Sequence, residues 1–211
     1  MDTQFWLERW ENNQIGFHKD VVNPALIDNV DKLALTPGSR IFLPLCGKTL
    51  DCGWLLSRGY RVAGSELSES AIEQLFKGLG AEPEVSQTAK LKLYQAENID
   101  IFAGDFFDLS ARTLGTVDAT YDRAALIAFP EHMRKQYTAH LMTITHKARQ
   151  LLVSFQYEPN PIEGPPFSVN EEEVSRLYGA SYALDLISSR DIPEGYKDKY
   201  PAKEKVWMLR E

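Results

Sequence analysis

Apolar positions change their spacing in a regular way between residues 41 and 66. A short apolar run over residues 41–45 stops at Cys46 and Gly47, and residues 51–57 then carry apolar positions at helical spacing as far as Gly59. Residues 60–64 form a second apolar run. Short continuous runs are typical of buried strands, and glycine marks the turns between elements. The pattern therefore predicts a strand, a helix and a second strand in succession.

Strand-like and helix-like patterns continue to alternate along the rest of the chain. We predict helices over 70–78, from Pro130 onward with an apolar stripe ending at Ala148, and over 170–178 before Gly179. The predicted strands are a hairpin over 91–95 and 99–103, then 117–121, 151–155, and a closing antiparallel pair over 182–188 and 205–209. This order predicts an α/β fold with a doubly wound, mostly parallel sheet and an antiparallel edge.

Two further helices are predicted before the first strand. One covers residues 3–12, and a second opens at Asn23 and Pro24, so that residues 1–36 form an N-terminal helical extension. Trp6 and Trp10 share one face of the first helix, and Phe17 follows it. Large aromatic rings outside the sheet suit a lid over a ligand, particularly a cationic one. The alternative is a helix that simply packs on the core.

Composition narrows the class of protein. A chain of 211 residues with 44% hydrophobic and 25% charged residues suits one globular domain, residues 1–211. The net charge of −7 disfavours nucleic acid as a partner, and the longest apolar run, residues 124–129, is too short to cross a membrane. The N-terminus lacks the order of a signal peptide. We therefore expect a cytoplasmic protein, with Cys46 and Cys52 as free thiols.

An acidic residue follows the second predicted strand at a distinctive position. Glu66 lies 21 residues after Leu45 (66 − 45). An open α/β sheet binds ligands at the carboxyl ends of its strands, and a carboxylate about 20 residues after the first strand–helix turn can accept both hydroxyls of a ribose. Glu66 is therefore a candidate ribose ligand. The alternative is a solvated glutamate that caps the helix near Ser68.

Several other sequence motifs of known binding and catalytic sites are incomplete or absent in this chain. Gly47, Lys48 and Thr49 resemble the end of a phosphate-binding loop, but Phe42 stands where that loop needs a glycine. The G-x-G-x-x-G dinucleotide fingerprint is also absent, and a turn with one glycine suits an amino-acid tail better than a pyrophosphate. The four histidines show no metal-ligand spacing, and no serine lies in a G-x-S-x-G motif. We therefore predict neither a metal site nor hydrolase chemistry.

The segments LPLCGKTLD, GSELS, DRAAL and GPPFSV, with W-x-x-x-W and GFH near the start, together resemble the thiopurine S-methyltransferase family. The resemblance spans nearly the whole chain in order, and PLCGK and GPPF are its most specific parts. It implies a class I methyltransferase fold with a seven-stranded sheet. It also implies transfer of a methyl group from S-adenosylmethionine to an aromatic or heterocyclic thiol.

The same resemblance implies which residues form the site. Matched residue by residue, it suggests contacts with the cofactor from Trp10, Leu45, Glu66 and Arg123, with Asp105 and Phe106 at the adenine and Phe17 at the substrate. Glu66 would hold the ribose diol. Arg123 would favour the substrate thiolate or bind the carboxylate of the cofactor. Its alternative role is a surface salt bridge to Asp122 or Glu131.

The implied chemistry needs little from the protein. A sulfonium methyl is already activated, so the site mainly holds a thiolate in line and excludes water, with no covalent nucleophile. We expect a monomer acting on a small-molecule thiol. The alternatives are a selenium or tellurium acceptor, an O- or N-methyltransferase with His18 as the nearby acid or base, and a module that binds S-adenosylmethionine without catalysis.

Overall fold

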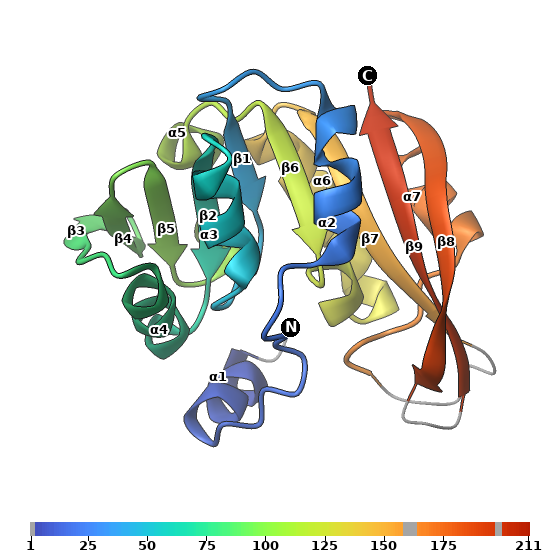
Figure 1. Ribbon diagram of the computed structural model, residues 1–211, viewed down its shortest axis with the longest axis horizontal. Helices are drawn as coiled ribbons and strands as arrows, with labels where there is room; N and C mark the ends of the chain where they lie inside the picture. Colours follow the sequence, from blue (N-terminus) through green and yellow to red (C-terminus); the bar gives the residue numbers. More distant parts are fainter. Residues whose placement is uncertain (1–2, 158–163, 197–199) are drawn as a thin grey trace.

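The computed structural model describes residues 3–157, 164–196 and 200–211, and they form an α/β sandwich around one sheet (Figure 1). Residues 1 and 2 of the predicted N-terminal extension lie outside this range. The helices are α1 (Thr3–Glu11), α2 (Pro24–Asn29), α3 (Leu50–Ser57), α4 (Glu69–Leu79), α5 (Ala111–Leu114), α6 (Glu131–Ile144) and α7 (Glu171–Tyr178), with short 3-10 turns η1 (Val30–Leu33), η2 (Phe106–Asp108) and η3 (Leu126–Ala128).

The described residues form a nine-stranded sheet in the order β3-β4-β5-β2-β1-β6-β7-β9-β8. Its strands are β1 (Arg40–Leu43), β2 (Arg61–Glu66), β3 (Glu84–Thr88), β4 (Leu91–Ala96), β5 (Ile99–Ala103), β6 (Ala119–Arg123), β7 (Arg149–Tyr157), β8 (Ala183–Tyr196) and β9 (Tyr200–Arg210). The run from β5 to β7 pairs in parallel, whereas β4 and β9 run antiparallel to their neighbours. The predicted fold class is confirmed.

The described residues form nine strands, more than the seven that the family resemblance implies and one more than the eight that the apolar pattern predicts. The strand missing from the pattern-based prediction is β3, which pairs with β4 at the outer edge of the sheet. Its residues are almost all exposed, so its sequence EVSQT carries no alternation of apolar and polar positions that would mark a half-buried strand. The closing pair β8 and β9 is also longer than its apolar segments indicated, because the hairpin continues beyond the body of the sheet.

Helices cover both faces of the sheet, as expected for a doubly wound fold. Neighbouring residues of β1 show this directly: Ile41 and Leu43 pack in a core with α2, α3 and α4, whereas Phe42 packs in a second core with α5, α6 and α7. All four residues of β1 are buried, which explains why the strand appears as a continuous apolar run. None of the described helices is long and apolar enough to cross a bilayer.

The N-terminal segment approaches the sheet from one edge. In Figure 1 the arrowheads of β1, β2, β5 and β6 point toward the side where α1 lies, so α1 is beyond the carboxyl ends of the parallel strands. The segment is fastened before α2, because the backbone N–H of Asn23 donates to the buried carboxylate of Asp51 on α3 at 2.8 Å. The carboxyl edge of the sheet is therefore where the extension and the strand ends meet.

Candidate functional site

A cleft opens at the carboxyl ends of β1, β2 and β5. It has an empty volume of about 250 Å³, part of which is open to solvent. Its lining contains Leu45, Glu66, Asp105 and Phe106, four of the residues predicted to contact the cofactor, and Thr3 of α1 lies at the same cleft. Residues far apart in the sequence therefore meet here because parallel strands end at one edge of the sheet.

Glu66 is the best-anchored polar group of the cleft. Its Oε2 accepts a hydrogen bond from the backbone N–H of Gly47 at 2.8 Å, and its Oε1 accepts one from Ser68 at 2.9 Å. Burial raises the pKa of Glu66, and these backbone N–H groups partly oppose that rise. A carboxylate offers about four lone-pair sites, so the Glu66 side chain keeps acceptor capacity for a diol. The cap of α4 is the Ser68 hydroxyl, which accepts from Ala71 at 3.2 Å, so Glu66 is not merely a solvated cap.

The turn between β1 and α3 has a strained backbone. Leu45 has a φ of +50°, which is unfavourable for a residue with a Cβ, and its backbone N–H donates to the Ser65 hydroxyl at 3.3 Å. Gly47 has a φ of +55°, and a Cβ added there would lie 3.1 Å from Cζ2 of Trp10. The indole of Trp10 therefore rests directly on this turn.

The two cysteines flank the same turn and are both buried and free, as predicted. A hydrogen bond with Cys52, together with burial, raises the pKa of the Cys46 thiol well above its usual range. Because a thiolate is the reactive form of cysteine, this environment keeps Cys46 a packing residue rather than a nucleophile.

The Asp105 and Phe106 pair lies at the end of β5. The Asp105 carboxylate accepts from the backbone N–H of Phe107 at 2.9 Å and so caps η2. Phe106 is 4% exposed, and its ring packs against His140 and Tyr137 at centroid distances of 5.1 Å. Phe106 is thus largely a core residue that reaches the cleft wall, and its predicted packing on adenine remains a prediction.

Arg123 ends β6, the next parallel strand beyond β1, and does not line the cleft. Its side chain is partly buried, and in the described part of the chain it forms no hydrogen bond or ion pair. Neither suggested salt-bridge partner is available to it. Asp122 accepts from the Tyr137 hydroxyl at 2.7 Å and from the Leu126 N–H at 3.2 Å, and Glu131 pairs with Arg176 at 3.2 Å. The guanidinium of Arg123 is thus left for another partner.

Asp122 itself is a buried carboxylate with an unusual pKa. Its side chain is fully buried, and burial raises the pKa of Asp122 to about 6 despite the hydrogen bond from Tyr137. The residue that follows Arg123, Ala124, has a φ of +78°. The end of β6 therefore combines a buried acid, a strained backbone and an unmatched cation, a combination that is frequent at functional sites.

The N-terminal segment contributes aromatic residues and a histidine at the carboxyl edge of the sheet, near the Gly47 turn. Phe17 packs edge-on against Trp6 and Trp10, with centroid distances of 5.5 Å to each ring. His18 is partly buried, and its pKa is lowered first by burial and then by Lys48, with a smaller effect of Arg123, while Asp20 raises it. The aromatic residues predicted as a lid thus form one cluster between the Gly47 turn and the Arg123 strand end. Movement of this cluster as a lid remains a prediction.

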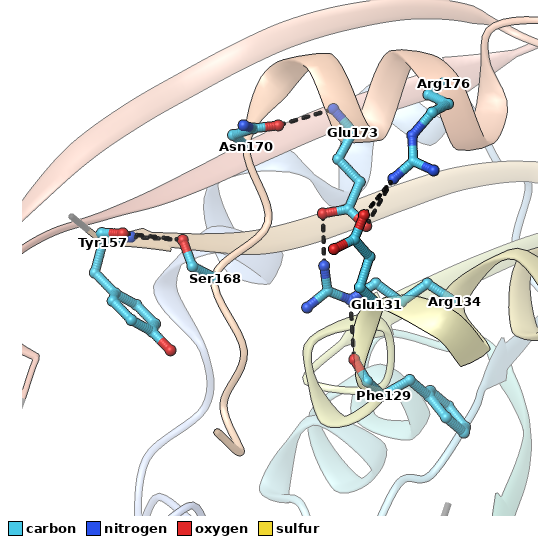
Figure 2. A network of polar contacts seen from close by, with 8 residues as sticks. All are labelled: Phe129, Glu131, Arg134, Tyr157, Ser168, Asn170, Glu173 and Arg176. Carbon is cyan, nitrogen blue, oxygen red and sulfur yellow. Dashed lines mark hydrogen bonds and ion pairs between the residues drawn. The ribbon is translucent and has the colours of Figure 1, made fainter. Parts of the chain in front are cut away.

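The GPPF loop is held against η3 by contacts that sequence inspection missed, and Figure 2 shows the neighbouring Arg134 with its partners Phe129 and Glu173. The Phe167 N–H donates to the Ile127 carbonyl at 2.7 Å, and the guanidinium of Arg134 lies 5.8 Å from the Phe167 ring centroid. Arg134 is buried, donates to the Phe129 carbonyl at 2.9 Å and pairs with Glu173 at 2.5 Å. No local pattern marks these pairs, because their members are far apart in the sequence. The loop is therefore a fixed wall at the carboxyl edge.

The fold places the chain in a broad class. A magnesium protoporphyrin IX methyltransferase from Synechocystis, solved with bound S-adenosylhomocysteine, is 14% identical, with a TM-score of 0.68 and full coverage of both chains. A TehB-like methyltransferase from Corynebacterium glutamicum, also 14% identical, has a TM-score of 0.57 and covers 99% of this chain and 98% of its own. The fold is that of S-adenosylmethionine-dependent methyltransferases.

Sequence comparison then identifies the family. The thiopurine S-methyltransferase family model matches residues 1–211. A thiopurine S-methyltransferase of Teredinibacter turnerae is 48% identical over 99% of this chain and 97% of its own length, and one of Xanthobacter autotrophicus is 48% identical over 99% of both. The chain belongs to the thiopurine S-methyltransferase family, which confirms the resemblance drawn from its motifs.

Proposed function

We propose that this protein is a methyltransferase that uses S-adenosylmethionine and methylates the sulfur of aromatic or heterocyclic thiols, such as thiopurines, by direct in-line displacement. Family membership and relatives that share nearly half of the sequence support this activity. One structural observation carries the proposal: the unmatched guanidinium of Arg123 ends the strand next to β1, beside the cleft that holds Glu66. Cofactor and acceptor sites would then meet at one sheet edge.

The chemistry of the cleft suits this cofactor. Glu66 and Asp105 are acceptors for a ribose diol and an amino group, and the described residues that line the cleft include no lysine or arginine. Such a lining disfavours phosphates and favours an uncharged nucleoside with a cationic tail. Trp10 rests on the Gly47 turn, and its predicted contact with the cofactor would occur at this turn. S-Adenosylmethionine would supply a methyl group already activated on a sulfonium.

The protein then has three tasks. The guanidinium of Arg123 would attract the acceptor thiolate through its charge, and it would not act as a general base. Phe17 and the tryptophans packed against it would exclude water and border the substrate. The turns that follow β1 and β6, where Leu45 and Ala124 have positive φ, would position the cofactor and the acceptor relative to each other. No covalent nucleophile or metal ion takes part in this scheme.

A second candidate is O- or N-methyl transfer, which is favoured only by the position of His18. Burial is the main cause that lowers the pKa of His18, which keeps the imidazole neutral and able to accept a proton. A substitution of His18 by Asn would separate the candidates. Loss of methylation of a phenol or amine, with thiol methylation retained, would support a role for His18 in the second activity.

Selenium or tellurium compounds are a further possible class of acceptor, because a site built for a soft thiolate suits other soft nucleophiles. Purified protein would be assayed with selenide and tellurite-derived acceptors beside a thiopurine.

We also propose that the protein works as a cytoplasmic monomer on small molecules, without nucleic acid. Sedimentation velocity at several protein concentrations tests the monomer, and a mass that rises with concentration would contradict it.

The decisive experiment measures cofactor binding and then methyl transfer with the same purified protein. S-Adenosylmethionine and its demethylated product are titrated calorimetrically into the purified protein, and a thiopurine is then added with ultraviolet detection of S-methylation. Binding with turnover supports the proposal. Binding without turnover favours another acceptor or a non-catalytic binding module, and failure of both ligands to bind would remove the cofactor roles of Glu66 and Leu45.

A further inference from the structure

Three side chains share one face of the sheet on the side of Arg123. Arg123 on β6 pairs with Val153 on β7, and two residues further along β7 Phe155 pairs with Glu204 on β9. Side chains two residues apart on a strand point to the same face, and paired residues share a face. Arg123, Phe155 and Glu204 therefore all project on the face that Tyr121 and Val206 share with α2.

The spacing leaves room between the two charged groups. Arg123 and Glu204 are separated by two strand spacings and by two residues along the strands, which corresponds to roughly 12 Å between their Cα atoms. Phe155 lies between them and packs beside Tyr157 and Tyr196 at centroid distances of 5.5 and 5.6 Å. The two charged side chains thus lie on the same face with Phe155 on the strand between them, and no ion pair joins them in the described chain.

Glu204 is partly buried, yet no hydrogen bond or ion pair satisfies it within the described ranges. Its cross-strand neighbour Arg190 is directed to Asp28 of α2 at 2.8 Å. Lys205 points to the opposite face, where its Nζ contacts Glu171 and Gln156 at 2.7 and 2.6 Å. Burial raises the pKa of Glu204, and Arg123 and Arg190 oppose that rise. A carboxylate left unmatched in such surroundings is a candidate for ligand contact.

We propose that Glu204 is a specificity-determining residue for the methyl acceptor: its carboxylate accepts a hydrogen bond from a ring N–H of a heterocyclic thiol. The sulfur of that thiol would lie toward Arg123, and its ring would pack on Phe155. This inference rests on the proposed function. A site built to accept a hydrogen bond discriminates against an analogue that lacks the donor, because its polar group is then left unpaired.

The test compares two acceptors that differ in this donor. A thiopurine carries ring N–H groups, whereas a benzenethiol has none. Glu204→Ala should lower kcat/KM for the thiopurine at least about tenfold, mainly through KM, and change kcat/KM for the benzenethiol by less than about twofold. Glu204→Gln should lie between wild type and Glu204→Ala, since an amide oxygen is a weaker acceptor. Equal losses for both thiols, or no loss for either, would overturn the inference.

A matched control is available on the same hairpin. Asp191 pairs with Lys203, and its side chain is 82% exposed. Asp191→Asn removes a charge of the same sign from the hairpin and should leave kcat/KM for both thiols unchanged. A selective effect that occurs only in Glu204 variants is then not a general effect of charge. Thermal unfolding of each variant reports folding, and the milder Glu204→Gln remains informative if Glu204→Ala is unstable.

Failure of this inference can be told apart from failure of the proposed function. Methylation of the benzenethiol by the wild-type protein reports on thiol methylation without any contribution from Glu204. If the wild type methylates neither thiol, the proposed function fails. Glu204 is then judged by calorimetric binding of the thiopurine in the presence of S-adenosylhomocysteine, and equal affinity of wild type and Glu204→Gln would overturn the inference.

Discussion

The two halves of the sheet's carboxyl edge treat their charged side chains in opposite ways. On the half formed by β1, β2 and β5, Glu66 and Asp105 each accept hydrogen bonds from backbone N–H groups of the surrounding turns. On the half formed by β6, β7 and β9, Arg123 and Glu204 are unmatched among the described residues, although each is partly buried. The acidic side chains of the first half therefore have hydrogen-bond partners within the protein, whereas the charged side chains of the second half have no ion-pair or hydrogen-bond partner among the described residues.

This difference suits two kinds of ligand. Backbone hydrogen bonds hold the Glu66 carboxylate in one orientation, which is appropriate for a ligand that is the same in every catalytic cycle. Unmatched groups on the second half would gain partners only when the acceptor arrives, so its charge and hydrogen-bond donors decide binding. We therefore expect substitutions on the first half, here called the cofactor half, to affect cofactor affinity. Substitutions on the second half, here called the acceptor half, should affect kcat/KM for the methyl acceptor.

The largest expected effect is on the cofactor half. Glu66→Ala removes the acceptor for Gly47 and Ser68 and for the proposed ribose diol, so affinity for S-adenosylmethionine should fall about 1,000-fold, or about 4 kcal/mol. Calorimetric titration measures the loss. Glu73→Gln, on an exposed position of α4, controls for a change of charge. Cofactor binding by Glu66→Ala at wild-type strength would refute the role of Glu66 and remove the contrast between the halves.

The second prediction concerns the buried Asp122 behind Arg123. Its pKa is about 6 in the folded protein and about 3.9 in an unfolded chain. The folded state therefore binds more protons at Asp122 between these values, so the stabilising contribution of Asp122 is fully present below about pH 4 and about 3 kcal/mol of it is lost as the pH rises through 6. Asp122→Asn should remove this part of the decline, because its amide cannot ionise.

Urea unfolding between about pH 4 and pH 8 measures the difference between Asp122→Asn and wild type at each pH. The difference also cancels the contributions of Glu66 and Glu204, whose pKa values are raised as well. Asp185→Asn, at an exposed position of β8, should keep the wild-type slope. A parallel pH profile for Asp122→Asn and wild type would show that Asp122 titrates normally.

A third prediction sharpens the acceptor half. Arg123→Met should lower kcat/KM for a thiol about 100-fold, or about 2.7 kcal/mol, because the thiolate loses its charged partner. The cofactor Kd should change by less than about threefold, since Arg123 does not line the cleft. Arg112→Met, on an exposed position of α5, is the control. A large loss of cofactor affinity in Arg123→Met would instead assign Arg123 to the cofactor carboxylate.

The smallest expected effect lies at the boundary between the halves. Gly47→Ala places a Cβ 3.1 Å from Trp10 at a φ of +55°, so it should destabilise the protein by about 1–3 kcal/mol and weaken cofactor binding modestly. Gly59→Ala has a similar φ of +81° but open space around its Cβ. It should therefore cost less, and thermal unfolding of both variants isolates the Trp10 contact. Equal destabilisation would show that Trp10 yields without strain.

Local patterning was sufficient for much of the cofactor half. The apolar run before Cys46, the glycine in the turn and the carboxylate after the second strand are separated by short stretches of chain, so the strand, helix, strand order and the position of Glu66 followed from spacing. The exposed strand β3 was missed because nothing in its sequence needed to be buried. Family membership followed from motifs that span the chain, and the comparisons confirm it.

The acceptor half depended on tertiary structure. Asp122 meets Tyr137, Arg134 meets Glu173, and Glu204 comes to the same face as Arg123 only through the register of β6, β7 and β9. A shift of one residue in any of these pairings would turn a side chain to the opposite face. Periodicity can mark a strand, but it carries no information about which distant strand becomes its neighbour. Short-range spacing therefore determined the elements and the cofactor turn, whereas strand pairing across the chain decided which charges were left unmatched.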